Sequence, residues 1–465
     1  MLLMKFGGTS VGDAKRVDGV REIVAKAVKE DSAVVVVVSA MSTITEFILE
    51  STRLAAAGDE PGAMKIIAQL EQKHFQTADE LFKGATRDEA RKVISDIVGG
   101  LKKICYGMAL LREMPLRAVD AALSVGERLS SIIVAWHLKE QGIKAEAVDS
   151  AKCVVTDDHF GSAGLLMDKT REATRNELLP MTGQKCVPVV TGFLGATAQG
   201  VRTTLGRGGS DYSGAIIAEA LGADELWIWT DVDGVLSADP KTVGDAVFLK
   251  ELTYEEASEL SHFGAKVLHH KTLAPLLSRM IPVYIKNSFS PEKRGTRIGA
   301  PREGSPKGPK AVTSIAPVTL LTLRSNGTPG ATDLFARTFA ELSHSQIEIL
   351  MVTQASYQES FCLLVPQASA DRAKSAIEHA FRLEINHGYL QAPERQDVAA
   401  IALIGEGMRG LPGIAAQMFG ALGKEKINII AIAQGASESN ISLVVGLEDR
   451  NNAVKAIHKE LIAAG

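Results

Sequence analysis

The chain has few cysteines and no long apolar run. Its four cysteines, Cys105, Cys153, Cys186 and Cys362, show neither CxxC spacing nor a partnering histidine cluster, which argues against a disulfide framework and a zinc site. The longest apolar run, Ala33 to Val38, is far shorter than the ~20 residues that a membrane helix needs. We therefore expect a soluble protein whose cysteines are reduced core residues.

Strong charge of either sign is also absent. The formal net charge is -4, with 46% apolar and 23% charged residues, so nothing indicates nucleic acid or a charged surface as partner. The first residues, MLLMKFGG, lack the layout of a signal peptide. These absences predict a cytoplasmic protein with no nucleic-acid or membrane partner.

At 465 residues the chain is too long for one ordinary core, so two or three domains are expected. In the first 300 residues, β-branched runs alternate with helical segments, which is typical of an α/β domain with a mainly parallel sheet. The expected strands are LLMKF, AVVVVVSAM, CVPVVTGF, ELWIWTDV and IPVYIKN, and the expected helices cover residues 13–29, 119–142, 211–221 and 254–279.

The last third of the chain repeats itself. Residues 287–308 are rich in Pro, Gly, Ser and basic residues, which predicts a linker. Beyond them, Leu323, Gly330, Phe339, Gln354 and Leu363 match Leu403, Gly410, Phe419, Gln434 and Leu443 at a constant offset of 80. Each copy follows the pattern strand, helix, strand, strand, helix, so two copies of one α+β unit are predicted. The expected domains are 1–290, a linker at 291–312, and repeat units at 313–395 and 396–465.

The first expected strand leads into KFGGTSVG. Backbone N–H groups at Gly7 and Gly8, the Ser10 hydroxyl and a helix N-terminus could bind an anion, and Lys5 adds positive charge. The lysine precedes the glycines, so this is not the GxxxxGK[ST] P-loop. An ordinary strand-to-helix turn is the alternative interpretation.

Three more polar loops follow expected strands: SAMSTIT, TTLGRGGSDYSG and WTDVDGVLSADP. In a parallel sheet the carboxyl ends of the strands share one edge, where ligands bind in open α/β folds. The last loop lacks the glycine and closing glutamate of an EF-hand, which argues against calcium. Lys5, Arg207 and Lys266 together with Asp211 and Glu127 provide the mixture of charges that phosphoryl transfer requires.

Seven segments in order resemble the aspartate kinases of the amino-acid kinase family over essentially the whole chain. They are KFGGTSVG, SVGERLSS, VTDDHFGSA, TTLGRGGSDYSGA, WTDVDGVLSADP, FGAKVLHHKTL and VYIKNSFSP. The repeat resembles paired ACT regulatory domains, and IAQGASESNISLVV is similar to their effector-binding signature. The resemblance implies a three-layer α/β sandwich with a mainly parallel sheet, followed by two ferredoxin-like α+β ACT domains.

The resemblance also implies an activity. The expected reaction is ATP-dependent phosphorylation of the side-chain carboxylate of L-aspartate, with Mg²⁺, giving 4-phospho-L-aspartate and ADP, the entry step to lysine, threonine and methionine. Lys5 and Asp211 would be catalytic, with Lys5, Gly7, Gly8 and Ser10 near the phosphates. The residues expected to bind aspartate are Thr45, Glu127, Arg207, Gly208, Gly209 and Ser210. Arginine suits the α-carboxylate and Glu127 the α-ammonium.

The nucleotide contacts implied by the resemblance are Thr230, Asp231, Leu236, Lys241, Lys266 and Val267. Two of them depart from the family pattern, in which many members have tyrosine at the position of Leu236 and arginine at that of Lys241, so nucleotide affinity is expected to differ. For His269 and His270 we favour a helix end without a catalytic role.

Regulation is expected through Gln354, Gln434 and Asn440, which would bind an amino-acid effector. The first repeat is most similar to the kinase half of the fused aspartate kinase and homoserine dehydrogenase enzymes, so threonine is the favoured inhibitor and lysine the rival. The chain ends at Gly465 without a dehydrogenase half. A homodimer or homotetramer joined through the ACT domains is expected. The alternatives are a non-catalytic amino-acid sensor and a kinase for another carboxylate such as glutamate or acetylglutamate.

Overall fold

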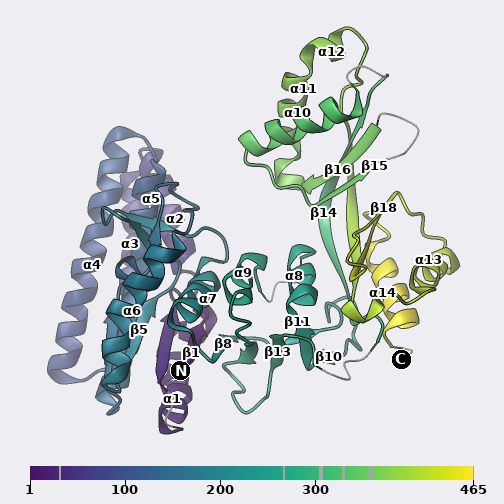
Figure 1. Cartoon of the computed structure of the whole chain (residues 1–465). Coiled ribbons are helices and arrows are strands. Elements are labelled where there is room, and N and C mark those ends of the chain that lie inside the picture. The colour runs from purple at the N-terminus through teal and green to yellow at the C-terminus, as the bar shows by residue number, and fades with distance from the viewer. Residues whose placement is uncertain (31–32, 265–267, 303–306, 327–329, 355–359, 464–465) are drawn as a thin grey trace. The chain divides into compact units, whose positions relative to one another are not determined.

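The computed structural model describes residues 1–30, 33–264, 268–302, 307–326, 330–354 and 360–463. The chain forms two compact units (Figure 1). The first comprises residues 1–235, 250–254 and 267–300, and the second comprises residues 236–249, 255–266 and 301–465. The chain therefore leaves the first unit and returns to it twice before the repeat begins.

The first unit is built on an eight-stranded sheet with strand order β11-β13-β12-β8-β1-β2-β5-β3. Its strands are β1 (Leu2–Phe6), β2 (Val34–Val38), β3 (Ala145–Val148), β5 (Val187–Thr191), β8 (Glu225–Thr230), β11 (Glu251–Thr253), β12 (Val283–Asn287) and β13 (Thr296–Gly299). All neighbours are parallel except β12 and β13. The predicted mainly parallel sheet and its five predicted strands are confirmed.

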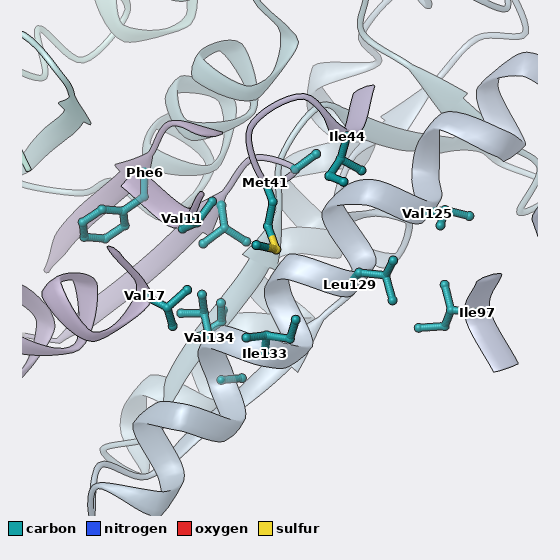
Figure 2. Close-up of a cluster of buried hydrophobic side chains, with 14 of the residues drawn as sticks. Phe6, Val11, Val17, Met41, Ile44, Ile97, Val125, Leu129, Ile133 and Val134 are labelled. Carbon is teal, nitrogen blue, oxygen red and sulfur yellow. The ribbon is translucent and has the colours of Figure 1, made fainter. Parts of the chain in front are cut away.

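Helices cover both faces of this sheet. α1 (Ala14–Lys29) and α5 (Leu116–Glu140) pack on one face, and α6 (Met167–Gly183) and α7 (Gly209–Leu221) form a layer that packs on strands β1, β2, β5 and β8. Figure 2 shows the apolar core between the sheet and the first of these layers, where side chains of β1, α1 and α5 meet. The three-layer architecture expected from the resemblance is thus present.

Strand alternation divides the residues of β1 between the two faces. Leu2, Met4 and Phe6 belong to the core beside α1 and α5. Lys5 lies on the other face, because a Cβ atom added to Gly214 of α7 would stand 3.3 Å from the Lys5 Cβ. The only charged residue of β1 is therefore directed toward the helix that begins at the glycine-rich loop.

A helical insertion and a small sheet complete the first unit. α2 (Ile44–Ala56), α3 (Glu60–Leu81) and α4 (Gly84–Leu111) pack on one another and on α5 (Figure 1). A three-stranded sheet contains β4 (Val155–Thr156), β6 (Leu194–Thr197) and β7 (Arg202–Thr204), and short 3-10 helices cover Gly8–Val11 and Ser150–Lys152. Among the described residues, no helix is long and apolar enough to cross a membrane.

Two predictions of local structure are wrong. The single helix expected over residues 254–279 is divided into α8 (Tyr254–His262), a 3-10 turn (His270–Thr272) and α9 (Ala274–Leu277). Gly264 has φ +92, a left-handed conformation that ends the first helix, and Pro275 favours a new helix start. Within the expected linker at 291–312, residues 296–299 form β13, because Thr296 and Ile298 are buried in the sheet.

The second unit contains a six-stranded antiparallel sheet with order β15-β16-β14-β17-β19-β18. Its strands are β14 (Ala311–Arg324), β15 (Met351–Gln354), β16 (Ser360–Pro366), β17 (Glu394–Ile404), β18 (Ala431–Gln434) and β19 (Asn440–Gly446). Its helices are α8, α10 (Ala331–His344), α11 (Ala370–Ala380), α12 (Arg382–Asn386), α13 (Ile414–Lys424) and α14 (Arg450–Leu461), and a ribbon of β9 (Val235–Leu236) and β10 (Phe248–Leu249) begins at its boundary.

The predicted repeat is visible in this sheet. β15 and β16 recur 80 residues later as β18 and β19, and each repeat has its own apolar core. The long strand β14 serves both repeats, because residues 311–315 pair with the end of β17 while residues 318–324 pair with β16. The two repeats thus share one continuous sheet, which the sequence pattern did not predict.

Candidate active site

Four polar loops meet at the carboxyl ends of the central strands. A Cβ atom on Gly8, after β1, would stand 2.8 Å from the Ala40 carbonyl after β2. A Cβ atom on Gly192, after β5, would stand 2.9 Å from the Ser210 Cβ, and the Gly7 amide donates to the Trp229 carbonyl of β8 at 3.0 Å. Only glycine allows the first two approaches, so Gly8 and Gly192 let these loops come together.

An ion pair lies where these loops meet. The Lys5 ammonium is 2.5 Å from the Asp211 carboxylate, and the two side chains are 8% and 20% exposed. Asp211 lies in the first turn of α7, two residues after Gly209. The Lys5 Nζ is also 3.8 Å from where a Cβ of Gly7 would stand. A nearly buried cation, oriented by a carboxylate, therefore adjoins the first glycine turn.

The polar groups of the first turn are only partly available to a ligand. The Gly7 amide already donates to Trp229, and the Ser10 hydroxyl lies 2.8 Å from the Ser288 hydroxyl. The Ser10 side chain is 1% exposed. Ser10 therefore joins two loops of the protein, and this arrangement weakens its expected role as a phosphate ligand.

Glu127 is a buried carboxylate on α5, and it accepts a hydrogen bond from the Ala40 amide. Burial raises its pKa to about 7, against the lowering effects of the Ala40 amide and of Lys5. A Cβ on the preceding Gly126 would stand 2.7 Å from the Ala40 Cβ, so glycine lets α5 approach this loop. A bound cation, such as an ammonium group, would stabilise the ionised form of this buried carboxylate.

Thr45, the second residue of α2, is half-buried beside a strained loop. Thr43 has φ +70, and Lys73 of α3 donates to the Ser42 carbonyl at 2.5 Å. Burial lowers the pKa of Lys73. Lys73 is not among the residues predicted from sequence, because it lies in an ordinary amphipathic helix outside every motif, where no local signal marks it.

Arg207 is exposed on the glycine-rich loop, and it makes no ion pair within the described part of the chain. Gly206 and Gly208, on either side, have φ +75 and +73, conformations that favour glycine. A Cβ on Gly208 would stand 2.5 Å from the His269 Cβ. His269 thus packs against the turn, and its expected lack of a catalytic role stays a prediction.

The predicted nucleotide residues fall into three groups. Thr230 and Asp231 lie at the end of β8, where the Ser288 amide and hydroxyl donate to the Thr230 carbonyl. Leu236, half-buried on β9, and Lys241, exposed, belong to the second unit. Lys266 and Val267 lie outside the described residues. The structure therefore brings the first pair beside the Gly7 turn and leaves the others as predictions.

The described residues contain no group of three or more His, Cys, Asp or Glu side chains arranged as a metal site. Magnesium in phosphoryl-transfer sites is usually held by one or two carboxylates and the phosphates of the substrate. Asp211 provides such a carboxylate at the junction of the loops. These residues fit an ion that arrives with a nucleotide.

The three predicted effector residues differ in their surroundings. Gln354 and Gln434 are exposed at the equivalent ends of β15 and β18, and the Thr353 hydroxyl donates to the Ile432 carbonyl at 3.0 Å, so these strands lie side by side. The side-chain NH₂ of Asn440 instead donates to the Glu259 carboxylate of α8 at 2.6 Å. Asn440 therefore attaches α8 to the second repeat.

Residues 1–287 match the Amino acid kinase family, and residues 321–381 and 401–461 each match the ACT domain. The chain therefore belongs to the amino acid kinase family, with two ACT domains after the kinase unit. Within this family it belongs with the aspartokinases. It is 31% identical to Aspartokinase 1, chloroplastic, of Arabidopsis thaliana over 100% of this chain and 80% of that protein.

Relatives with a second enzyme activity are also similar. The bifunctional aspartokinase/homoserine dehydrogenase of Daucus carota is 34% identical over 98% of this chain and 50% of its own length, so the chain spans about half of such relatives. Among solved structures, E. coli aspartokinase III in complex with aspartate and ADP gives a TM-score of 0.84 at 30% identity, with 99% of each chain covered. Its complex with lysine and aspartate gives 0.78, also at 30% identity and 99% of each chain.

Proposed function

We propose that this protein transfers the γ-phosphoryl group of ATP to the side-chain carboxylate of L-aspartate, giving 4-phospho-L-aspartate and ADP. The observation that carries this proposal is the Lys5–Asp211 ion pair at the junction of four polar loops, with the buried Glu127 carboxylate nearby. The product is an activated acyl phosphate, suited to the first step toward lysine, threonine and methionine.

The amino-acid substrate has two complementary charged partners. Glu127 would pair with its α-ammonium, and the bound cation would favour the ionised form of Glu127, whose pKa is raised in the free protein. The exposed fork of Arg207 would bind the α-carboxylate through two parallel hydrogen bonds. The side-chain carboxylate is then left for the reaction, with Thr45, Gly208, Gly209 and Ser210 as further ligands.

Phosphoryl transfer requires positioning and neutralisation of charge. A side-chain carboxylate oxygen of aspartate attacks the γ-phosphorus, the bond from that phosphorus to the bridging oxygen breaks, and ADP leaves with the electron pair. Lys5 would stabilise the negative charge on the equatorial oxygens, and Asp211 would hold Lys5 in place. Mg²⁺, when bound by the phosphates and Asp211, would neutralise further charge.

ADP release tests this assignment directly. We expect turnover with aspartate and little with glutamate or N-acetylglutamate. Lys5→Ala should lower kcat by about 10²- to 10³-fold, because it removes a preorganised charge from the transition state. Asp211→Asn should also lower kcat, and Lys15→Ala, at an exposed lysine of α1, serves as the matched control. Wild-type turnover in either site variant would refute the assigned roles.

We further propose that an amino acid inhibits the enzyme through the ACT pair, with threonine favoured and lysine the rival, in a homodimer or homotetramer. Support comes from the exposed Gln354 and Gln434 at equivalent strand ends. Titrating activity with threonine and lysine separately decides the effector. Inhibition by lysine without any effect of threonine would overturn the choice.

Helix α8 offers a route for this regulation. Glu255 accepts a hydrogen bond from Ser439 at 2.8 Å, and Glu259 accepts one from Asn440 at 2.6 Å. Glu256, which is fully buried, accepts from the Lys310 ammonium at 2.7 Å and from the Glu406 amide at 2.9 Å. Because the chain continues from α8 into the predicted nucleotide residues 266–267, α8 would transmit a change in the second repeat to nucleotide binding.

A further inference from the structure

Asp120, on α5, is a fully buried carboxylate to which the resemblance assigns no role. It accepts three hydrogen bonds: from the Gly161 amide at 2.9 Å, from the Thr204 amide at 3.0 Å and from the Thr204 hydroxyl at 2.7 Å. Burial raises its pKa, and these three donors lower it. Among the described residues no ion pair of Asp120 is found, and its hydrogen bonds go to two chain segments.

The first of these segments is the loop 157–164, and the second is the strand that enters the glycine-rich loop. They also bond to each other, because the Ala163 amide donates to the Thr204 carbonyl at 2.9 Å. A Cβ on Gly206 would stand 2.9 Å from the Ser162 hydroxyl oxygen. Arg207 follows directly. The loop 157–164 therefore forms one wall of the turn that presents Arg207, and Asp120 holds both parts.

The same helix carries the other end of the proposed amino-acid site. Glu127 lies seven residues after Asp120, about 10 Å along the helix axis. Gly126 fixes the approach of α5 to the loop after β2. A single rigid helix thus determines the location of Glu127 directly and that of Arg207 through Asp120 and Thr204.

We propose that Asp120 is a positioning residue for the amino-acid substrate, which sets the distance between Arg207 and Glu127 through its hydrogen bonds to Gly161 and Thr204. This inference rests on the proposed function. The inference goes beyond the proposed function, because it assigns the alignment of the substrate to a residue that does not contact the substrate. It also gives a role to the loop 157–164, a motif of the resemblance that the proposed reaction leaves unused.

The test compares Michaelis constants for the two substrates. Asp120→Ala should raise KM for aspartate by about tenfold or more and change KM for ATP by less than about twofold, because only the amino-acid ligands are displaced. Asp120→Asn should restore most of the affinity, since its carbonyl oxygen still accepts the two amides and the Thr204 hydroxyl can accept from its NH₂. A purely structural role would reduce the amount of folded enzyme and leave KM for aspartate unchanged.

Two further variants keep the test decisive. Glu219→Ala is the matched control, because Glu219 is also buried, at 2% exposure, but pairs with Arg171 and Arg279 away from the glycine-rich loop. It should leave KM for aspartate unchanged. If Asp120→Ala does not fold, Thr204→Val, which removes only one of the three bonds, should raise KM for aspartate about threefold or more.

The failure of the inference differs from that of the proposed function. Wild-type protein that releases no ADP with aspartate would refute the function. Active wild-type protein together with an unchanged KM for aspartate in both Asp120→Ala and Thr204→Val would overturn the role of Asp120. If Asp120→Ala does not fold, an unchanged KM for aspartate in Thr204→Val is sufficient to overturn the role of Asp120.

Discussion

Replacing Glu127 with glutamine should make the aspartate-free protein more stable above neutral pH and should weaken its binding of aspartate. Glu127 is almost completely buried, at 4% exposure, and its pKa is raised from 4.5 to about 7, chiefly by burial. The ionised form therefore costs free energy in the folded state. Glutamine has nearly the same shape and carries no charge at any pH.

The size of the effect follows from linkage between protonation and folding. The folded and unfolded pKa values of Glu127 differ by about 2.5, and each pH unit corresponds to about 1.4 kcal/mol, which gives about 3 to 4 kcal/mol over the whole window and about 3 kcal/mol from pH 5 upward. Between pH 4.5 and about 7 the folded state retains a proton that the unfolded state has lost. The contribution of Glu127 to stability therefore falls as the pH rises through this window, and it stays low above it.

Tryptophan fluorescence during urea unfolding is a suitable assay. The three tryptophans, Trp136 on α5 and Trp227 and Trp229 on β8, all lie in the first unit, so the signal reports on the unit that contains Glu127. The free energy of unfolding would be measured for wild type and Glu127→Gln from pH 5 to 8.5, without aspartate or nucleotide.

The difference between the two proteins isolates Glu127, since all other groups titrate in both. We expect the variant to gain stability relative to wild type as the pH rises to about 7, by about 3 kcal/mol in total, and then to keep a constant advantage. Glu89→Gln, at an exposed position of α4, should show no such trend. A difference that is flat over this pH range would refute the raised pKa. Unchanged KM for aspartate in Glu127→Gln would refute the ammonium contact.

Further predictions concern packing, loop support and regulation. Gly126→Ala should lower stability by about 1–3 kcal/mol in urea unfolding, because the added Cβ would stand 2.7 Å from that of Ala40. Lys73→Met should raise KM for aspartate by about threefold to tenfold with the fold intact by circular dichroism, because it releases the strained loop before Thr45. Gln354→Ala should raise the inhibitory threonine concentration at least about threefold without changing uninhibited kcat. Glu259→Ala should also raise the inhibitory threonine concentration in the same titration. Unchanged inhibition in this variant would argue against transmission through α8.

Local patterns in the sequence were sufficient for the sheet, the repeat and the glycine loops. The run of five valines predicted a strand buried on both faces, and β2 is buried throughout. The constant offset of 80 predicted equivalent elements, and the two ACT matches begin 80 residues apart. These features depend on residues that are close in sequence or related by a simple period.

Long-range contacts could not be predicted in this way. Asp120 and Thr204 are 84 positions apart, and Lys73 and Ser42 are 31 apart. Nothing in the composition near Asp120 indicates that its carboxylate bonds to a distant turn. The division of residues 254–279 was missed for a related reason, because the apolar spacing continues through Gly264 while part of the segment joins the second unit.

The two faces of the sheet separate stability from chemistry. On β1, Leu2, Met4 and Phe6 contribute to an apolar core, whereas Lys5 is directed to the opposite face and to Asp211. The groups that cost free energy are the buried Glu127 carboxylate of α5, which accepts from the Ala40 amide, and the strained Thr43, and both belong to or contact the loop that follows β2. Period-two alternation thus lets one short strand support the core with one set of side chains and direct the Lys5 cation to Asp211 with the other. A one-residue register slip of β1 would exchange these roles, burying Lys5 in the core, so the same hydrophobic pattern that stabilises the sheet also fixes the location of the cation.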